Sequence, residues 1–374
     1  TVEGPGTLTG LVASLESTVS PALIDPGQTA TLTVTLRNGG IPLAATGGSG
    51  AVWVRSVPGA AGPITVRVTH PSLGSASASV QVAAVHPPLA AQTASRQPSA
   101  SLTGVSLTVS APPGATVAAT SPTAWAAVAP GQAVTATWNV TASAQPSTSS
   151  GVTLVVAAAL TAGGQPASLT TSSVLPVVIP LSAAYDNAGI SDDAAPPTTA
   201  NFDGVGNSFS EEALTAAGFA PGGTVKVGGL SFTWPAVAAG SADNVVAQGQ
   251  TISIAGSGTN LGFLGASASG SNTGSGTVHY TDGTTSTFPL ALADYFNPAA
   301  SGADVAASMT YCNDSNPATN GGTAGRREQS VGIYFAGAPI TAGKPVRAVT
   351  LPTGGTIPAS GRISGMHVFA IAVG

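Results

Sequence analysis

Apolar side chains alternate with Thr or Ser along many short stretches of this chain, and this period of two restricts its fold most strongly. Residues 29–38 read TATLTVTLRN, and residues 62–70 and 75–85 continue the alternation. Successive side chains of a β-strand point to opposite faces, so the pattern is typical of strands with one buried face. Gly and Pro clusters separate the stretches at the spacing of hairpins and sandwiches. The sequence therefore predicts an all-β protein.

Charged residues are scarce in this chain. They make up 7% of its 374 residues, against about 25% in an ordinary soluble protein. Low charge is shared with disordered linkers, but the alternation of Val and Leu with Thr indicates folded strands. Lys occurs only at Lys226 and Lys344, and the net charge is −5. Because phosphate binding needs clustered cations, we expect no nucleic-acid partner.

The compartment is inferred from the cysteine content and from the absence of long apolar runs. No run approaches the roughly 20 apolar residues that span a bilayer, so we expect no membrane span. Cys312 is the single cysteine, which excludes a disulfide framework and a cysteine-based metal cluster. The chain opens at TVEGPGTLTG and ends in a strand-like MHVFAIAVG. We expect a C-terminal portion of a longer secreted bacterial protein.

Two copies of one motif suggest how the chain divides into domains. IDPGQTATLTVTL (24–36) and VAPGQAVTATWNV (128–140) each place a Pro-Gly turn before an alternating run. This repeat predicts two related Ig-like sandwiches. We expect an Ig-like sandwich over residues 1–85, a polar proline-bearing linker over 86–99, a second Ig-like sandwich over 100–180 and a larger jelly-roll-type sandwich over 181–374.

Local signals are clearest in the last predicted domain. SFSEEALTAAGF carries Ser210 as a helix N-cap, two Glu in the first turn and Gly218 as a C-cap. HYTDGTTSTF (279–288) places Asp-Gly between two alternating runs, which predicts a hairpin. LPVVIPLSAAY (175–185) is expected to hold an edge strand that leads directly into this domain.

Three stretches resemble known domains of secreted glycosidases. VEGPGTLTG (2–10) with residues 51–82 resembles the last Ig-like domain of family-2 glycoside hydrolases, and residues 100–180 resemble the Ig-like domain associated with α-galactosidases. YDNAGISDD…NFDGVGNSFSEEALTAAGF and the sequence that follows, to residue 374, are similar to a C-terminal β-sandwich of secreted actinobacterial hydrolases. The resemblance implies an accessory module attached to an upstream catalytic domain of the same polypeptide.

Acidic residues are absent from positions 26–185 and then return abruptly in YDNAGISDD (185–193) and NFDGVGNSFSEE (201–212). A glycosidase pair would need two carboxylates facing each other across a cleft, whereas adjacent Asp192 and Asp193 would point opposite ways on a strand. Nothing in the sequence positions a general acid, so we predict no catalytic residues. Two alternatives stay open: Asx turns at the start of a domain, or a structural calcium ion. The calcium ligands would be Asp186, Asn187, Asp192, Asp193 and Asp203.

A carbohydrate site needs an exposed aromatic ring with polar neighbours, because a sugar stacks on a flat face while its hydroxyls take directional hydrogen bonds. Aromatic residues are only 5% of the chain, so candidates are few. Trp234 shares a strand face with Phe232, so it could equally belong to the core, as we expect for Trp53, Trp125 and Trp138. The predicted ligand-binding residues are Trp234, His279, Tyr280, Asn313 and Arg326.

The remaining reactive residue types show no catalytic arrangement in the sequence. His70, His86, His279 and His367 lie near no nucleophile elbow, and Cys312 has no evident base. We therefore predict a non-catalytic accessory region of a secreted glycoside hydrolase that positions the catalytic domain and holds polysaccharide, with no required cofactor. The alternative is a structural or adhesive extracellular protein of tandem sandwiches that assembles or attaches to a surface.

Overall fold

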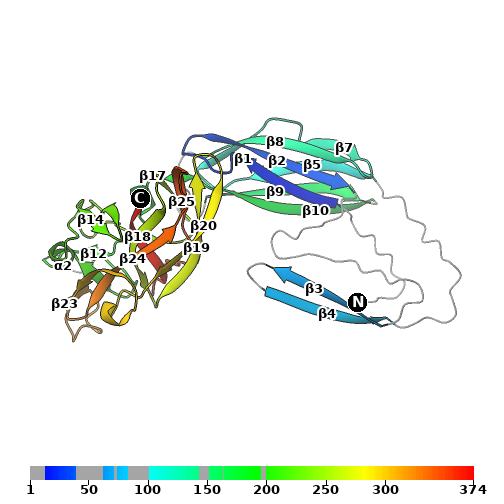
Figure 1. The fold of residues 1–374 in the computed structure, drawn as a ribbon. Helices are drawn as coiled ribbons and strands as arrows, with labels where there is room; N and C mark the ends of the chain where they lie inside the picture. The colour runs from blue at the N-terminus through cyan, green and yellow to red at the C-terminus, as the bar shows by residue number, and fades with distance from the viewer. Residues whose placement is uncertain are drawn as a thin grey trace.

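The computed structural model describes residues 13–38, 62–70, 74–82, 101–142, 151–162, 164–194 and 199–374, the second and third of these ranges by backbone alone. Within these residues the protein is almost entirely β-structure (Figure 1), which confirms the predicted all-β class. The described helices are short, and none is long and apolar enough to cross a membrane.

The first sandwich packs two four-stranded sheets face to face. Alternate side chains of its strands are buried, so that Leu32, Val34 and Leu36 of β2 point into the core while the intervening Thr residues point outward. The sheet orders are β1-β2-β8-β6 and β10-β9-β5-β7. The strands are β1 Ala13–Ser20, β2 Thr29–Asn38, β5 Leu102–Ser110, β6 Ala115–Ala119, β7 Ala124–Val128, β8 Ala133–Ala142, β9 Val152–Ala162 and β10 Gln165–Leu175.

The two copies of the Pro-Gly motif lie in this one sandwich, which corrects the predicted separation of residues 1–85 from residues 100–180. The copies form β2 and β8, which are antiparallel neighbours. The Gly27 N–H donates to the Ala142 carbonyl at 2.7 Å, and the Gly131 N–H donates to the Asn38 carbonyl at 2.9 Å. Each turn therefore closes the end of the other copy's strand. A repeated motif in the sequence is compatible with two tandem domains or with two paired strands of one domain. The observed pairing of β2 with β8 shows the second arrangement.

Between β2 and β5 the structure describes one hairpin. β3 Gly62–His70 pairs antiparallel with β4 Gly74–Val82, from Gly62 opposite Val82 to His70 opposite Gly74. The predicted strand at 51–57 with Trp53, and the predicted linker 86–99, lie outside the described residues. Of the other expected core tryptophans, Trp138 is buried and Trp125 packs against the core half-buried.

The second sandwich packs two five-stranded sheets, and its chain passes repeatedly from one sheet to the other, as in jelly-roll-type folds. The sheet orders are β11-β17-β25-β19-β20 and β16-β26-β18-β24-β21. The predicted Asp-Gly hairpin is present between β19 and β20, with Gly283 at φ +82°. The strands are β11 Val178–Ile179, β16 Val245–Val246, β17 Thr251–Gly256, β18 Asn260–Ala268, β19 Asn272–Tyr280, β20 Thr285–Leu292, β21 Val305–Met309, β24 Val331–Pro339, β25 Val346–Thr350 and β26 Gly365–Val373.

Smaller elements cover one end of the second sandwich. The predicted helix is α2 Glu211–Ala216, where the Ser210 hydroxyl caps the helix by accepting from the Ala213 N–H at 3.0 Å. Gly218 follows the helix at φ +93°. A four-stranded sheet, β12-β13-β22-β23, lies beside this helix. The bounds are β12 Ile190–Ser191, β13 Asn207–Ser210, β22 Cys312–Asp314, β23 Gly325–Arg327, β14 Thr224–Val227, β15 Leu230–Thr233, α1 Leu181–Ala184 and η2 Pro298–Ala300.

The two sandwiches are joined through the segment around β11. Val177 forms a parallel bridge with Ile24 of the first sandwich, and the Val178 N–H donates to the Ile24 carbonyl at 2.8 Å. β11 itself pairs with β17 of the second sandwich. The segment is therefore hydrogen-bonded to both units, as the predicted edge strand at this boundary would be. A small apolar cluster of Leu23, Val178 and Ala348 lies at the same place.

Candidate functional site

Trp234 does not offer a sugar-binding face, contrary to the prediction. Its side chain is 1% exposed. One face of the indole stacks on Phe369 with 5.0 Å between ring centroids, and Phe219 contacts it edge-on at 4.9 Å. Because these rings occupy the surface that a sugar would need, Trp234 is a core residue.

His279 and Tyr280 also lie within the sandwich, on β19. The Tyr280 ring is buried, and its hydroxyl is 2.7 Å from the Ser286 hydroxyl and accepts from the Thr341 N–H at 2.9 Å. The half-buried His279 places Nε2 2.8 Å from the Thr350 hydroxyl. Both side chains therefore bond to their own sheet or to the loop beside it, and neither meets Asn313 or Arg326 as predicted.

Asn313 and Arg326 do come together, because β22 and β23 pair antiparallel. Asn313 lies directly opposite Arg326, and Cys312 lies opposite Arg327. Tyr311 directly precedes β22 and contacts one of the two predicted residues. The Arg326 guanidinium carbon is 3.7 Å from the centroid of the Tyr311 ring, a cation–π contact.

Asp193 completes this group from the other side of the small sheet. The Tyr311 hydroxyl donates to Asp193 Oδ2 at 2.7 Å, and Asn313 Nδ2 donates to Asp193 Oδ1 at 2.9 Å. Asp193 and Arg326 are exposed, Tyr311 is half-buried and Asn313 is buried. These four residues, Asp193, Tyr311, Asn313 and Arg326, are called the Tyr311 cluster below.

Buried hydroxyls and the start of α2 hold the cluster in place. Asn313 Nδ2 also donates to the buried Ser191 hydroxyl at 2.9 Å, and Ser191 lies 2.8 Å from the Ser208 hydroxyl. The Ser210 hydroxyl donates to the Tyr311 hydroxyl at 3.2 Å. The backbone N–H of Asp193 donates to Glu212 in the first turn of α2 at 3.1 Å. The cluster is thus fixed from β12, β13 and α2 together.

An ion pair between Arg327 and the buried Asp314 links β23 to β22. Arg327 Nη1 donates to Asn207 Oδ1 at 2.8 Å and to Asp314 Oδ2 at 3.3 Å. The Asp314 side chain is fully buried, and its carboxylate also accepts from Thr319 and from the Asn316 N–H. Removing one partner of such a pair leaves a buried charge uncompensated, so Arg327 and Asp314 have a structural role.

The ionisation states of the cluster follow from these contacts. Partial burial opposes ionisation of Asp193, but hydrogen bonds from Tyr311, Ser210 and Asn313 outweigh it and lower its pKa. Burial, together with the neighbouring Asp193, raises the pKa of Tyr311. At neutral pH the cluster therefore presents a carboxylate, a phenol, an amide and a guanidinium, and it contains no activated nucleophile.

The predicted calcium ligands do not converge on one point. Asp186 accepts from the Val246 N–H and from Gln250, and burial raises its pKa to about 6. Asn187 bonds to Asn201 and Asn244. Asp192 forms an Asx turn by accepting from the Ala194 N–H. Asp203 accepts from the N–H groups of Val205 and Asn207, the Asn207 amide and the Tyr295 hydroxyl.

The carboxylate oxygens that a calcium ion would need thus already accept hydrogen bonds from protein N–H and O–H groups. Within the described part of the chain, no three His, Cys, Asp or Glu side chains are grouped as metal ligands. Asp193, the fifth predicted ligand, belongs to the Tyr311 cluster and bonds to its side chains.

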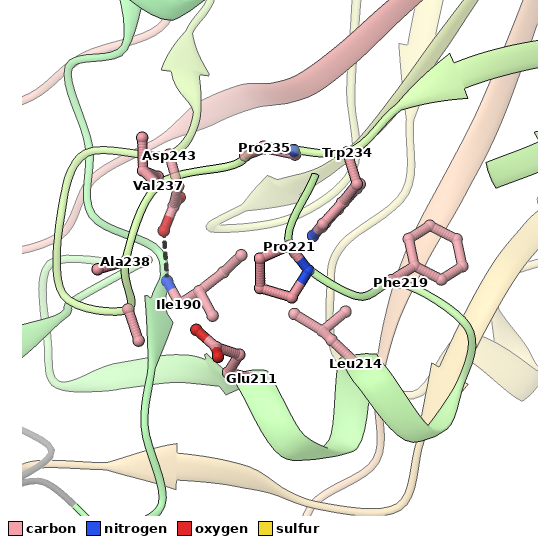
Figure 2. Close-up of a pocket in the computed structure, with 11 residues that line it drawn as sticks. Ile190, Glu211, Leu214, Phe219, Pro221, Trp234, Pro235, Val237, Ala238 and Asp243 are labelled. Atoms are coloured by element: carbon pink, nitrogen blue, oxygen red, sulfur yellow. Dashed lines mark hydrogen bonds between the residues drawn. The ribbon is translucent and has the colours of Figure 1, made fainter. Parts of the chain in front are cut away.

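A depression beside α2 is lined by apolar residues and two carboxyl side chains (Figure 2). Its free volume is about 10 Å³, space for one water molecule. At its wall Asp243 accepts from the Gly189 and Ile190 N–H groups, and Figure 2 shows the latter bond. The lining residues are Ile190, Glu211, Leu214, Phe219, Pro221, Trp234, Pro235, Val237, Ala238, Ala239 and Asp243. A sugar ring does not fit here, so the Tyr311 cluster is the better candidate site.

The fold and the cluster define a protein of β-sandwiches with a preorganised, partly exposed polar and aromatic surface at one end of the second sandwich. Residues 175–353 match the family model of the AziU2-like β-sandwich domain. Residues 89–160 match the model of the NPCBM-associated NEW3 domain of α-galactosidase. A comparison with curated proteins finds no match.

These matches fit the domain types that the sequence predicts. The first begins at Leu175, where β10 ends, and covers the second sandwich without its last strand, β26. The second covers β5 to β8 and most of β9. The first sandwich also uses β1, β2 and β10, which lie outside that match.

The ligand prediction did not include Tyr311 and Asp193 of the cluster, nor Ser210 and Glu212, which hold the cluster in place. Tyr311 lies within the polar TYCNDSNP stretch (310–317), and this position was its one visible signal. Its partner Asp193 lies 118 residues away in the sequence, and Arg326 lies on the next strand. The pairing of β22 with β13 and β23 places these segments side by side.

Proposed function

We propose that this chain is a non-catalytic accessory region of a secreted glycoside hydrolase, and that its second sandwich binds a glycan at the Tyr311 cluster. The first sandwich serves as a spacer toward an upstream catalytic domain of the same polypeptide. The match to a domain associated with α-galactosidase supports the glycosidase context.

The observation that carries the proposal is the cation–π stack of Arg326 on Tyr311, whose hydroxyl donates to Asp193. Sugar hydroxyls act as both donors and acceptors, and here a carboxylate, an amide and a guanidinium lie around one aromatic ring. Tyr311 and Asn313 are fixed by their hydrogen bonds to Asp193, and Arg326 is fixed by an ion pair with Glu328 at 2.6 Å. The side chains are therefore ordered before a ligand arrives, which reduces the entropy that binding would cost.

The same geometry argues against glycoside hydrolysis at this surface. An acid catalyst needs a carboxyl group that stays protonated near neutral pH, and the hydrogen bonds to Asp193 lower its pKa instead. Asp203, another carboxylate of the acidic stretch, is buried and bonded to Tyr295 and Asn207. We expect no turnover of a broad glycoside panel by this chain, and activity that is lost in Asp203→Asn would contradict this.

Calorimetric titration with a panel of neutral oligosaccharides and soluble polysaccharides tests the proposal. Tyr311→Ala and Arg326→Ala remove the stack, and each is expected to weaken binding by about tenfold or more, or 1.4 kcal/mol. Arg362→Ala is the matched control, because Arg362 is an exposed arginine outside the cluster. Thermal unfolding checks that each variant is folded.

Two outcomes would contradict the proposal. One is that no glycan of the panel binds to the folded chain. The other is that Arg326→Ala and Arg362→Ala weaken binding equally, which would place the glycan elsewhere.

An adhesive or self-assembling protein is the second candidate, favoured by the outer face of β2 and β8. Thr29, Thr35, Thr135 and Thr141 lie on this face, and hydroxyl pairs link the strands at 2.9 Å and 3.2 Å. Apart from Arg37, which pairs with Glu16 of β1, this face presents hydroxyl groups, and it can lie against another surface with little desolvation of charge. Concentration-dependent assembly in sedimentation experiments, without glycan binding, would favour this candidate over the first.

A further inference from the structure

The loop that joins β22 to β23 contains an Asn-Gly pair. The loop reads SNPATNGGTA over residues 315–324, and Asn320 precedes Gly321. Gly321 and Gly322 are exposed, and both have positive φ values, +65° and +94°. The pair therefore lies at an accessible turn, directly before the strand that carries Arg326.

The Asn320 side chain ties this turn to the beginning of β23. Its Nδ2 donates to the carbonyl oxygens of Gly325 and Arg326, each at 3.2 Å. Both bonds come from the two N–H groups of one side-chain amide. The position of the first residues of β23 therefore depends on that amide remaining intact.

The backbone nitrogen of Gly321 differs from its neighbours. The Asn320 and Gly322 N–H groups both donate to the Pro317 carbonyl, at 3.3 Å and 2.8 Å. Among the described residues the Gly321 N–H has no acceptor. It is exposed to water, and glycine has no Cβ to block its approach to a neighbouring side chain.

We propose that Asn320 is a site of spontaneous deamidation. The Gly321 backbone nitrogen loses its proton and attacks Asn320 Cγ, which closes a five-membered succinimide and releases ammonia. Water then opens the ring at either carbonyl to give aspartate or isoaspartate. One water is consumed and one ammonia is released in total, and no oxidant, reductant or enzyme takes part.

The product is incompatible with the contacts that the amide makes. A carboxylate has no N–H to donate, and it would face the carbonyl oxygens of Gly325 and Arg326 across the former bonds. Isoaspartate also adds a backbone atom to the loop. We infer that β23 loosens at its start and that Arg326 leaves the Tyr311 ring. The consequence for ligand binding rests on the proposed function, whereas the chemical step does not.

The chain holds a second Asn-Gly pair, at Asn38, which serves as an internal comparison. Asn38 lies in β2 and is 5% exposed, and its Nδ2 donates to the Val128 carbonyl at 2.9 Å. A buried side chain that is hydrogen-bonded to a neighbouring strand has little freedom to change its rotamer. We expect many-fold less modification at Asn38 than at Asn320.

Peptide mapping by mass spectrometry after incubation at mildly alkaline pH tests the site. We expect aspartate and isoaspartate to accumulate at position 320 and the rate to rise with pH, because the attacking nitrogen must lose its proton. Asn320→Gln keeps an amide but needs a larger ring, so modification at this position should be lost. If the peptide that contains Asn320 is recovered from the incubated wild-type protein and Asn320 is unmodified, the proposal is overturned.

A second measurement separates the modification from its consequence. Asn320→Asp represents one product, and its glycan affinity is expected to fall to the level of Arg326→Ala while Asn320→Gln stays close to wild type. If deamidation occurs but no glycan binds to any form, the chemical step stands and the proposed function fails. If Asn320→Asp binds as wild type does, the inferred effect on Arg326 is wrong.

Discussion

Asp243 is a buried carboxyl group without a cationic partner among the described residues. It is 1% exposed, and it accepts from the N–H groups of Gly189 and Ile190 and from the Asn244 amide. Burial raises the pKa of this group from 3.8 to about 7, although the hydrogen bonds partly offset the effect. Through its hydrogen bonds to Gly189 and Ile190, Asp243 also holds the segment that leads into β12. Ser191 of β12 in turn accepts a hydrogen bond from Asn313 of the Tyr311 cluster.

This pKa predicts that the protein loses stability as pH rises toward neutrality. The folded chain binds the Asp243 proton more tightly than the unfolded chain, so the contribution is fully present below pH 3.8 and is lost through about pH 7. Each unit of difference corresponds to about 1.4 kcal/mol. Asp186 acts in the same direction, because burial raises its pKa to about 6.

Urea unfolding at a series of pH values between about 5 and 8 measures this effect. Asp243→Asn is expected to flatten the profile, because the variant has no proton to lose at this position. Asp304→Asn, at an exposed aspartate, is the matched control and should keep the wild-type slope. A profile of unchanged slope in Asp243→Asn would show that this residue is ionised in the folded protein.

A second prediction at this scale concerns calcium. The carboxylate oxygens of Asp186, Asp193 and Asp203 accept hydrogen bonds from separate protein groups. We therefore expect calcium or a chelator to leave the melting temperature unchanged. A rise with calcium that is lost in Asp203→Asn but kept in Asp304→Asn would restore the predicted calcium site.

At the residue scale the sequence singled out some members of the Tyr311 cluster and not others, for a physical reason. Asn313 and Arg326 were found from their polar character, and they lie opposite each other in one strand pair. Trp234 was placed in the site by residue type alone, yet it stacks on Phe369 inside the core. A single strand does not reveal which of its faces another sheet covers, so aromatic residues could not be divided into core and surface.

At the scale of elements, local signals predicted local structure well. The Ser210 cap, the Asp-Gly hairpin and the alternating strand at 29–38 occur where the sequence places them. Each depends on neighbours within a few residues. The pairing of β2 with β8 joins segments about a hundred residues apart, and the repeat was consistent with either one sandwich or two.

The paired repeat makes a specific prediction about its two turns. Gly27 and Gly131 have φ values of +81° and +77°, and an added Cβ would meet no atom within 4 Å at either position. Gly27→Ala and Gly131→Ala therefore add backbone strain alone, and each is expected to cost about 1–2 kcal/mol. Because the turns occupy equivalent positions in one sheet, the two costs should be similar.

Chemical unfolding of both variants checks this equivalence. Thr31→Ala, at an exposed position of β2 between the turns, is the control and should cost less than either. A large cost at one turn with none at the other would contradict the local two-fold arrangement.

At the scale of the whole molecule, the junction of the two sandwiches determines whether the first can act as a spacer of fixed direction. The segment around β11 is hydrogen-bonded to Ile24 on one side and to β17 on the other. Arg347 of the second sandwich forms an ion pair with Asp25 of the first at 3.2 Å. These contacts join the two sandwiches directly. In a flexible linker the same backbone N–H and carbonyl groups would be hydrogen-bonded to water instead.

The junction predicts that both sandwiches unfold together. Calorimetry should give one transition whose van't Hoff and calorimetric enthalpies agree, because melting one unit exposes the apolar cluster of Leu23, Val178 and Ala348. Leu23→Asp places a carboxylate in that cluster and is expected to split the transition in two. Arg347→Ala should leave it single, since a half-exposed ion pair contributes about 0–1 kcal/mol. Two transitions in the wild-type protein would show that the sandwiches are independent, and the first could then no longer hold the Tyr311 cluster at a fixed angle to the upstream domain that we propose.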